Sequence, residues 1–216
     1  MLIAVLGGTG NLGFALARRW ALAGRRIVIG SRSADSAKAA AAEILKDAAG
    51  ADVTGDENAA ASAAADLVVL TVPFASQRAV LEHVKGALVG KVLIDATVPL
   101  VPPKVMRVQL PAEGSAAMLG AAIVGESVRV VSAFHNVPAE VIRTDAEVDC
   151  DVLVFGDDKA AREEAVSLAK DAGLRAFHTG ALANSASAEA LTSVLIFLNK
   201  QYGGHAGIRL TGLEHD

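Results

Sequence analysis

Three features of the sequence predict an α/β fold with a doubly wound parallel sheet. Short apolar runs alternate with longer segments of helical periodicity along most of the 216 residues. The apolar runs are nearly continuous, which is typical of strands buried on both faces of a parallel sheet. The first run leads directly into a glycine-rich turn and then into a helical segment. Strands and helices in this order imply a parallel sheet with right-handed crossovers.

The first two strand and helix pairs are the clearest elements. Residues 2–6 are all apolar and are followed by glycines, so they predict a short buried strand. Residues 11–23 carry apolar side chains at helical spacing, and Gly24 provides a stop signal. Residues 26–30 predict a second strand, and the alanine-rich residues 33–49 predict a second helix. Together these segments form one βαβα unit.

The alternation continues to the end of the chain with one irregular stretch. Four prolines between Pro99 and Pro111 predict a loop that crosses the top of the sheet. The further predicted strands are residues 52–54, 66–72, 91–95, 128–133, 151–155 and 175–178. The further predicted helices are residues 57–65, 75–88, 112–124, 158–172 and 185–200. We expect a first domain in residues 1–140 and a small C-terminal α/β extension in residues 141–216, whose strands either extend the first sheet or form another.

The charge and the cysteine content exclude several classes of protein. With a net charge of -4 and scattered Lys and Arg, no basic surface is expected for a nucleic-acid backbone, so we expect no nucleic-acid partner. No uncharged apolar run approaches the roughly 18–20 residues of a membrane span, so we expect no membrane segment. Cys150 is the only cysteine, which excludes an internal disulfide and a cysteine metal cluster. We therefore expect a cytoplasmic protein without a metal site.

A phosphate-binding motif of the form G-x-G-x-x-G follows the first predicted strand. It consists of Gly8, Thr9, Gly10, Asn11, Leu12 and Gly13. Gly8 permits a tight turn, Gly10 lets a pyrophosphate approach the backbone, and Gly13 lets the helix pack closely on the strand. The N-terminus of the helix also attracts the negative charge of a phosphate. In this context the motif predicts a Rossmann-type dinucleotide-binding domain in residues 1–140, and a plain glycine turn is the alternative.

The end of the second predicted strand indicates which dinucleotide binds. NAD-binding domains place an Asp or Glu there, which accepts hydrogen bonds from the ribose 2′-hydroxyl. In this chain the position holds Gly30, Ser31 and Arg32 instead. A 2′-phosphate would find the Ser31 hydroxyl and the forked donors of Arg32, which favours NADP(H) over NAD(H). The alternative is that Arg32 is a solvated cation at the start of a helix.

Two further strand ends are expected to face the same crevice. Open α/β sheets bind ligands beyond the carboxyl ends of their strands. Val72, Pro73 and Phe74 follow one buried strand, and Val98 and Pro99 follow the next. We expect the backbone of Val72 and Val98 to flank the nicotinamide ribose and Phe74 to form an apolar wall, while the prolines turn the chain away from the sheet. Ordinary packing at strand ends is the alternative for each residue.

Six short motifs together resemble one family. They are GGTGNLG, IGSR, LTVPF, SAFHNVPA, GDD and LANS, in this order. In this combination the chain resembles the F420-dependent NADP reductases over nearly its whole length. The resemblance implies hydride transfer between C4 of NADP(H) and C5 of the deazaflavin coenzyme F420, in a cleft between the Rossmann domain and a small C-terminal domain that also joins two subunits of a homodimer. Such chemistry needs positioning and exclusion of water more than acid or base groups.

The resemblance also implies which residues contact the two coenzymes. The NADP contacts fall on Thr9, Gly10, Asn11, Leu12, Ser31, Arg32, Val72, Val98 and Ala139. Lys38 is the nearest candidate for a lysine that follows Ser-Arg in the family. The F420 contacts fall near His135, Val137 and Pro138, and in the tail at Gly203, Gly204, Gly207 and Ile208. The resemblance therefore places the F420 site mainly in the C-terminal part of the chain.

His135 is the candidate catalytic residue. It follows a predicted buried strand, and a neutral imidazole could donate a hydrogen bond to a carbonyl of the deazaflavin ring. A buried histidine whose hydrogen bonds are satisfied within the protein is the alternative. Two other functions also stay open, because a fold does not decide function. They are an NADPH-dependent reductase of another acceptor, such as a flavin, quinone or ferric chelate, and an NADP-sensing regulator without turnover.

Overall fold

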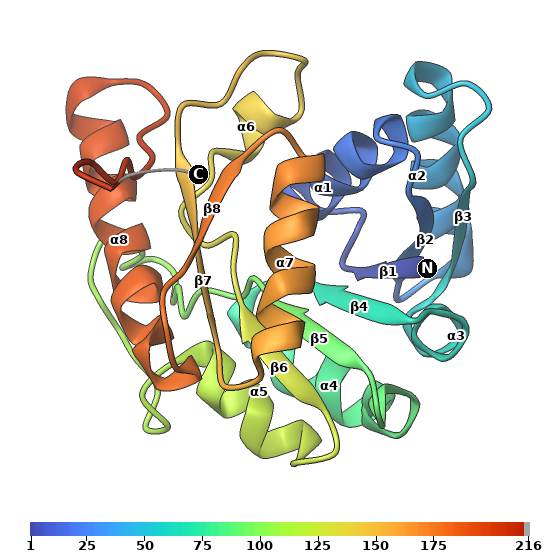
Figure 1. Ribbon diagram of the computed structural model, residues 1–216, viewed down its shortest axis with the longest axis horizontal. Helices are drawn as coiled ribbons and strands as arrows, with labels where there is room; N and C mark the ends of the chain where they lie inside the picture. The colour runs from blue at the N-terminus through green and yellow to red at the C-terminus, as the bar shows by residue number, and fades with distance from the viewer. Residues whose placement is uncertain (214–216) are drawn as a thin grey trace.

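Eight strands form one sheet in the computed structural model, which describes residues 1–213 (Figure 1). The strands are β1 (Leu2–Leu6), β2 (Arg26–Ser31), β3 (Val53–Glu57), β4 (Leu67–Leu70), β5 (Val92–Asp95), β6 (Arg129–Ser132), β7 (Asp151–Gly156) and β8 (Arg175–His178). Their order across the sheet is β3-β2-β1-β4-β5-β6-β7-β8. β1 to β6 are parallel, which confirms the predicted α/β fold. β2 and β3 are added on one side of β1, and the strands from β4 onward are added on the other side. Ligands bind at such a switch point in the strand order, which here lies between β1 and β4.

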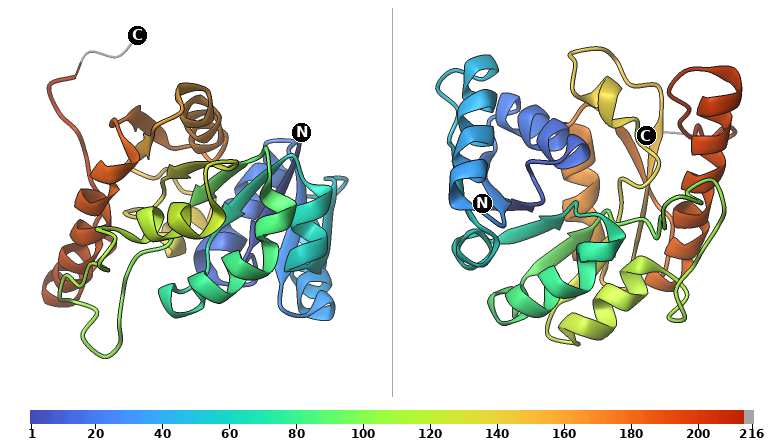
Figure 2. Two further views of the ribbon diagram at one scale, coloured as in Figure 1. Left: turned by 90° about the horizontal axis from the view of Figure 1, so that it is seen from below. Right: turned by 180° about the vertical axis from the view of Figure 1, so that it is seen from behind.

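Helices cover both faces of the sheet (Figures 1 and 2). They are α1 (Asn11–Leu22), α2 (Ala34–Asp47), α3 (Asn58–Ala64), α4 (Phe74–Leu88), α5 (Ala116–Val124), α6 (Ala139–Ile142), α7 (Lys159–Asp171) and α8 (Ser185–Tyr202), with a 3-10 turn η1 (Leu182–Asn184). α1, α2 and α7 enclose one hydrophobic core, and α3, α4 and α5 enclose the other. α8 lies at the far end, beyond β7 and β8 (Figure 1). Every helix within residues 1–213 falls short of the length and apolar character that a membrane span needs.

β1 shows why both faces of the sheet are apolar. Successive side chains of a strand point to opposite faces. Ile3 and Val5 belong to the core under α1, α2 and α7, whereas Ala4 and Leu6 belong to the core under α3, α4 and α5. All four side chains are fully buried. A strand that supplies two cores must be apolar at every position, which explains the continuous run in the sequence.

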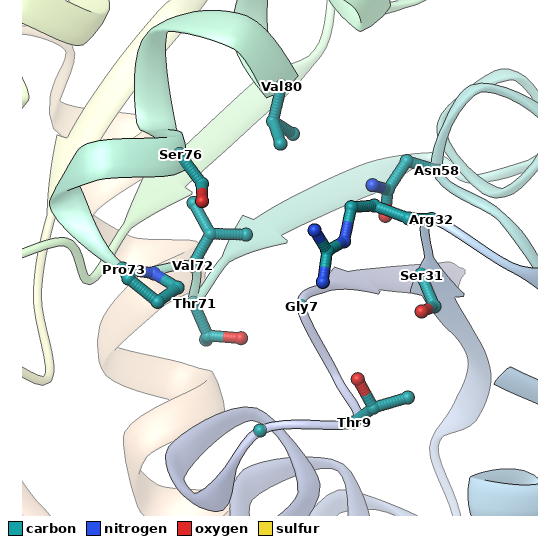
Figure 3. A pocket seen from close by; sticks show the side chains of 11 residues that line it. Gly7, Thr9, Ser31, Arg32, Asn58, Thr71, Val72, Pro73, Ser76 and Val80 are labelled. Atoms are coloured by element: carbon teal, nitrogen blue, oxygen red, sulfur yellow. The ribbon is translucent and has the colours of Figure 1, made fainter. Parts of the chain in front are cut away.

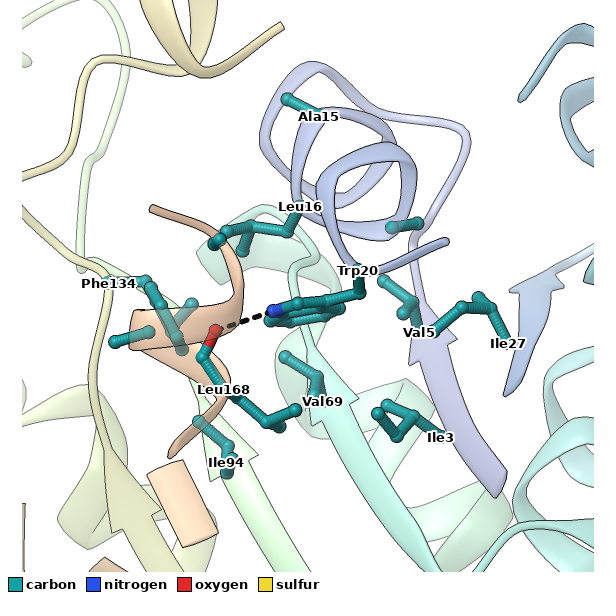
Figure 4. Close-up of a cluster of buried hydrophobic side chains, with 14 of the residues drawn as sticks. Ile3, Val5, Ala15, Leu16, Trp20, Ile27, Val69, Ile94, Phe134 and Leu168 are labelled. Atoms are coloured by element: carbon teal, nitrogen blue, oxygen red, sulfur yellow. Dashed lines mark hydrogen bonds between the residues drawn. The ribbon is translucent and has the colours of Figure 1, made fainter. Parts of the chain in front are cut away.

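Trp20 of α1 joins distant parts of the chain in the first core (Figure 4). Its Nε1 donates a hydrogen bond of 2.7 Å to the carbonyl oxygen of Leu168 on α7. Its ring meets that of Phe134 edge to face, with the centroids 5.9 Å apart. The neighbouring Arg19 donates to the carbonyls of Ile142 and Thr144. These contacts hold the C-terminal part of the chain against α1. The predicted domain boundary at residue 140 stays a prediction.

β7 departs from a wholly parallel sheet. It pairs antiparallel with β6, with Ser132 opposite Phe155. Parallel neighbours need a long crossover, usually a helix that packs across the sheet. The segment between β6 and β7 contains only the four-residue α6, so the chain turns back instead of crossing over. β8 is again parallel to β7 because α7 provides the crossover. Of the two alternatives for the C-terminal strands, the structure therefore shows an extension of the first sheet.

Capping side chains account for where several helices begin. α2 starts at Ala34 because the Ser33 hydroxyl accepts a hydrogen bond from the N–H of Ser36, in agreement with the prediction within one residue. α5 starts later than the predicted residue 112, because Ser115 is its cap. Residues 112–114 lie in a turn and bend, and Gly114 has a positive φ of 96°, which is not helical. The short α6 and η1 were not predicted, since neither contains a full period of apolar residues.

The tail after α8 returns along β7. α8 ends at Gly203, which has a positive φ of 71° and turns the chain back. The N–H of Asp151 donates to the carbonyl of Ile208 at 2.7 Å, and the N–H of Leu210 donates to the Asp151 carboxylate at 2.6 Å. Gly207 packs against Cys150 so closely that a Cβ would lie 2.5 Å from the cysteine Cβ. The tail is thus held as a strap beside the sheet.

Candidate functional site

The glycine motif forms a tight turn at the carboxyl end of β1. The N–H of Gly8 donates to the carbonyl of Val5 at 3.1 Å, and the N–H of Gly10 donates to that of Gly7 at 2.9 Å. α1 then begins at Asn11 with Gly10 as its cap and no side chain bonded to the first turn. The first N–H groups of a helix have no partner within the helix. They therefore face the space beyond β1 with the positive end of the helix dipole.

Each glycine of the motif is required by a close approach. A Cβ on Gly13 would lie 2.3 Å from Thr71 Oγ1 and 2.9 Å from the carbonyl of Gly7. A Cβ on Gly8 would lie 2.8 Å from the carbonyl of Val5. A Cβ on Gly10 would lie 3.2 Å from the carbonyl of Gly7, and it would also narrow the approach to the turn. The turn thus fits an anion bound by backbone N–H groups, as the dinucleotide motif requires.

Two adjoining cavities open beside this turn (Figure 3). The inner cavity, of about 190 Å³, is lined by Gly7, Thr9, Gly10, Ser31, Arg32, Asn58, Thr71, Val72, Pro73, Ser76 and Val80. The outer cavity, of about 390 Å³, is lined by Ser31, Arg32, Glu57, Asn58, Ala75, Ser76, Ala79, Val80 and His83. Ser31 and Arg32 belong to both walls. The structure therefore brings the glycine turn, the end of β2 and the end of β4 together, although they are far apart in the sequence.

Arg32 is the cation of these cavities. No other Lys or Arg among residues 1–213 lines either of them. Its side chain is exposed at the end of β2, where it extends toward the inner cavity (Figure 3). Glu57 lines the outer cavity, but at the end of β3 and not of β2. The carboxylate that would select a 2′-hydroxyl is absent from the end of β2, and a cation with a hydroxyl stands there instead.

Several predicted residues lie outside the two cavities. Lys38 is exposed on α2 and lines neither of them. Phe74 is half-buried at the start of α4, where it forms no part of either wall. Val98 and Pro99 follow β5, and the carbonyl of Val98 accepts a hydrogen bond from the N–H of Leu100 at 2.7 Å. The structure places Val72 and Pro73 in the inner cavity, so only one of the two predicted strand ends contributes to it.

His135 lies in a buried environment behind β6. Its side chain is 7% exposed, and its Nε2 is 2.8 Å from the Ser132 hydroxyl oxygen. Burial lowers the pKa of His135 to about 4, although a hydrogen bond with the backbone of Asp95 opposes the shift. The imidazole is therefore neutral near pH 7, as expected for a donor. Because one ring nitrogen already has a partner in the chain, this geometry supports the structural interpretation, and a catalytic role stays a prediction.

Residues 135–139, α8 and residues 203–210 lie together and are called the C-terminal cluster below. The Asn136 amide donates to the carbonyl of Ala188 at 2.9 Å and to Thr192 Oγ1 at 3.0 Å, both on α8. A Cβ on Gly207 would lie 3.7 Å from the carbonyl of Asn136. Two of the segments that the family resemblance assigned to F420 thus meet at Asn136 and Gly207, and Gly203, Gly204 and Gly207 are exposed. Within this cluster, the residues predicted to contact F420 are His135, Val137, Pro138, Gly203, Gly204, Gly207 and Ile208, and Ala139 is predicted to contact NADP.

Two buried carboxyl groups near this cluster were not predicted. Asp95 accepts hydrogen bonds from the Gln77 amide at 2.6 Å and from the N–H of Thr97 at 2.9 Å, and burial raises its pKa to about 6. Glu189 of α8 accepts from the N–H groups of Ala116 and Ala117 at the start of α5. Burial raises the pKa of Glu189 to about 7 in spite of these donors. For both carboxyl groups, the signal available in the sequence was a polar residue that ends or interrupts an apolar run.

The chain is similar to known proteins over its full length. A sequence model of the family described as NADP oxidoreductase coenzyme F420-dependent matches residues 2–99. The F420-dependent NADP reductase of Methanothermobacter thermautotrophicus is 43% identical to the chain over 222 residues, which cover 99% of this chain and 96% of that protein. The chain belongs to this family. The family member of Methanocaldococcus jannaschii is 41% identical and covers 99% of this chain and 100% of its own length.

A solved structure shares the architecture of the whole chain. The crystal structure of an Arthrobacter sp. FB24 protein superposes with a TM-score of 0.79 at 26% identity, and the match covers 97% of this chain and 98% of that one. The family fold therefore includes β7, β8, α8 and the tail as well as the nucleotide-binding half. Within residues 1–213 of this family member, no group of three or more His, Cys, Asp or Glu side chains is placed to hold a metal ion.

Proposed function

We propose that this chain transfers a hydride between NADP(H) and coenzyme F420, with NADP(H) held by the inner and outer cavities. The observation that carries the proposal is the wall shared by the glycine turn, Ser31 and Arg32 in a chain 41–43% identical to F420-dependent NADP reductases. When both coenzymes are bound, the nicotinamide ring supplies or takes up the hydride and the deazaflavin ring does the opposite. The protein has to bind, orient and shield the two rings.

The NADP(H) side of the site is built from backbone and two polar side chains. The N–H groups after Gly10 and the α1 dipole suit the diphosphate. The Ser31 hydroxyl and the Arg32 guanidinium suit a 2′-phosphate, since a forked cation matches phosphate oxygens. Val72 lies at the end of β4 on the inner wall, in a position to flank the nicotinamide ribose. Thr9, Asn11 and Leu12 complete the turn.

The F420 side of the site is assigned to the C-terminal cluster. Val137 and Pro138 are half-buried beside the tail, so they can present apolar surface to a flat ring and exclude water. If His135 also contacts the ring, a His135→Ala variant should lose F420 turnover while NADPH affinity is kept. Unchanged turnover in that variant would leave His135 with a structural role only.

The first test mixes the purified protein with NADPH and F420 under anaerobic conditions and follows the visible absorbance of the deazaflavin. Rapid bleaching with NADPH and little with NADH is expected. NADPH binding without bleaching would discard F420 and leave the two other functions, reduction of a flavin, quinone or ferric chelate, or NADP sensing. Absence of NADPH binding would contradict the assignment of the cavities themselves.

A homodimer is proposed from the exposed apolar face at the far end of the molecule. Val194, Phe197 and Tyr202 of α8 are exposed, as are Met106 and Val108 of the loop between β5 and α5. Met106 and Phe197 line one shared hollow with Lys200 and Gln201, so the loop and α8 meet at this surface. A second copy would cover such a patch, and closed pairs are the commonest assembly. Light scattering should give twice the chain mass, and a monomer across working concentrations would contradict the proposal.

A cytoplasmic location stays a prediction.

A further inference from the structure

Asn58 is a buried polar side chain without a complete set of partners. It is the first residue of α3, directly after β3, and it is only 7% exposed. Within the part of the chain that the structure describes, its Oδ1 has no hydrogen-bond partner. A buried carbonyl oxygen without a donor costs free energy, so such an atom in a native protein calls for an explanation. Asn58 also lines both cavities, which suggests that the missing partner comes from a ligand.

The space occupied by the Asn58 amide exists because residue 30 is glycine. A Cβ on Gly30 would lie 3.0 Å from Asn58 Oδ1 and 2.6 Å from a methyl carbon of Leu6. The amide therefore fits over the bare backbone of β2, one residue before Ser31. Figure 3 shows it directed toward the Arg32 side chain and the cavity. The terminal torsion of an Asn side chain is soft, so either its oxygen or its nitrogen can be presented to a bound molecule.

The surroundings of Asn58 fit a neutral, flat and polar-edged group. Ala75, Ala79 and Val80 of α4 form an apolar part of the outer wall. The Glu57 carboxylate lies next to Asn58 in the chain and lines the same cavity, so it repels a phosphate there. Arg32 lines the same cavity as its cation, so the anionic group of a ligand is expected at Arg32 and a neutral group at Asn58.

We propose that Asn58 recognises the adenine ring of the dinucleotide. The side-chain amide carries one acceptor and one donor group, which match the 6-amino group and N7 of adenine, whereas hypoxanthine presents two acceptors at these positions. Asn58 is then a specificity residue for the base, whereas Arg32 is one for the 2′-phosphate. The inference rests on the proposed binding of NADP(H) in these cavities, and it assigns a separate part of the nucleotide to a separate residue.

The test compares the dissociation constants of NADPH and NADH for four proteins by fluorescence titration. Adenine is common to both nucleotides, so Asn58→Leu should weaken both by the same factor, about tenfold for a lost hydrogen-bonded pair. Arg32→Ala should weaken NADPH alone. Ser62→Ala is the matched control, because Ser62 is buried in the same helix and bonded to the carbonyl of Asn58 but lines neither cavity. It should bind both nucleotides as the unmodified chain does.

A nucleotide analogue makes the test independent of the folding of any variant. Deamino-NADPH, which carries hypoxanthine in place of adenine, should bind the unmodified chain several-fold more weakly than NADPH. Asn58→Leu, or Asn58→Ala if the first variant fails to fold, should bind the two alike. Equal binding of NADPH and deamino-NADPH by the unmodified chain would overturn the proposal, as would Asn58 variants that keep full affinity for both NADPH and NADH. A failure of Arg32→Ala to discriminate would instead contradict the proposed cofactor site.

Discussion

The two halves of the proposed site are built in different ways. The cavity side is built around one contiguous glycine turn, in which Gly8 and Gly13 are placed by contacts with the adjacent strands, and the ends of β2 and β4 meet this turn. The C-terminal cluster depends on buried side chains that join segments far apart in the sequence, such as Asn136 with Thr192 and Glu189 with Ala116. A backbone motif tolerates almost no added atoms, whereas a cluster of side chains responds to charge and to lost hydrogen bonds. The two halves should therefore fail in different ways.

The largest effect is expected for Gly13→Val. The first added carbon would already lie 2.3 Å from Thr71 Oγ1 and 2.9 Å from backbone atoms of residues 7 and 8. Because backbone cannot yield cheaply, we expect a loss of about 3 kcal/mol or more of unfolding free energy, together with loss of NADPH binding. Urea unfolding and nucleotide titration measure the two effects. Gly86→Ala in α4 is the control, because a Cβ there meets nothing within 4 Å, and it should not destabilise.

The next largest effect concerns the charge of Glu189. Its pKa is about 7 in the folded chain and near 4.5 when unfolded, so the unfolded chain ionises first and stability falls as the pH rises from 4.5 to 7. The Glu189→Gln variant has no carboxyl group at this position, so it lacks this fall in stability. Relative to the unmodified chain, its unfolding free energy should therefore rise by up to about 3 kcal/mol between pH 4.5 and pH 8.

Urea unfolding at several pH values measures this difference. Asp95 and His135 titrate in the same range and are present in both proteins, so the difference reports Glu189 together with its charge interaction with Asp95. If the two proteins kept a constant difference in stability at every pH, the carboxyl group of Glu189 would not titrate in the folded chain as described.

A selective effect is expected for Arg32→Ala. Loss of a charge-assisted hydrogen bond to the 2′-phosphate should weaken NADPH binding by about 1.5–3 kcal/mol, which is roughly tenfold to a hundredfold, and should spare NADH. Arg26→Ala, at the other end of β2, is the control, since that arginine pairs with Asp52 on the surface. An equal loss of NADPH and NADH affinity in Arg32→Ala would show that Arg32 is not a 2′-phosphate ligand.

The smallest effect is expected in the C-terminal cluster for Thr192→Val. The change removes the oxygen that accepts from the Asn136 amide, at a cost of about 1 kcal/mol. NADPH affinity should not change, because Thr192 lines neither cavity, whereas the Michaelis constant for F420 should rise. Thr192→Ser keeps the hydroxyl and should behave as the unmodified chain. If Thr192→Val altered NADPH binding and not the F420 constant, the division of the site into two halves would be wrong.

The sequence predicted most elements of the nucleotide-binding half to within a few residues. The apolar patterns of β1, α1 and β2 are local properties. The cap at Ser33 lies beside the helix that it begins, and the stop at Gly24 lies beside the helix that it ends. It did not predict the late start of α5, which depends on Ser115 and on Glu189 more than seventy residues away. The prediction of Lys38 as a cofactor contact has the same limit, because spacing along a helix does not show which face of the helix lies at the cavity.

By itself the sequence determined the α/β order, the glycine turn and the absence of a carboxylate at the end of β2. These features arise between near neighbours in the chain, where spacing and residue type already define the geometry. Only the tertiary structure decided the antiparallel β7, the hydrogen-bonded pair of Asn136 and Thr192, and the position of Asn58 over Gly30. Each of these joins residues whose approach depends on how whole strands and helices pack, and a pattern read along one chain does not contain that information.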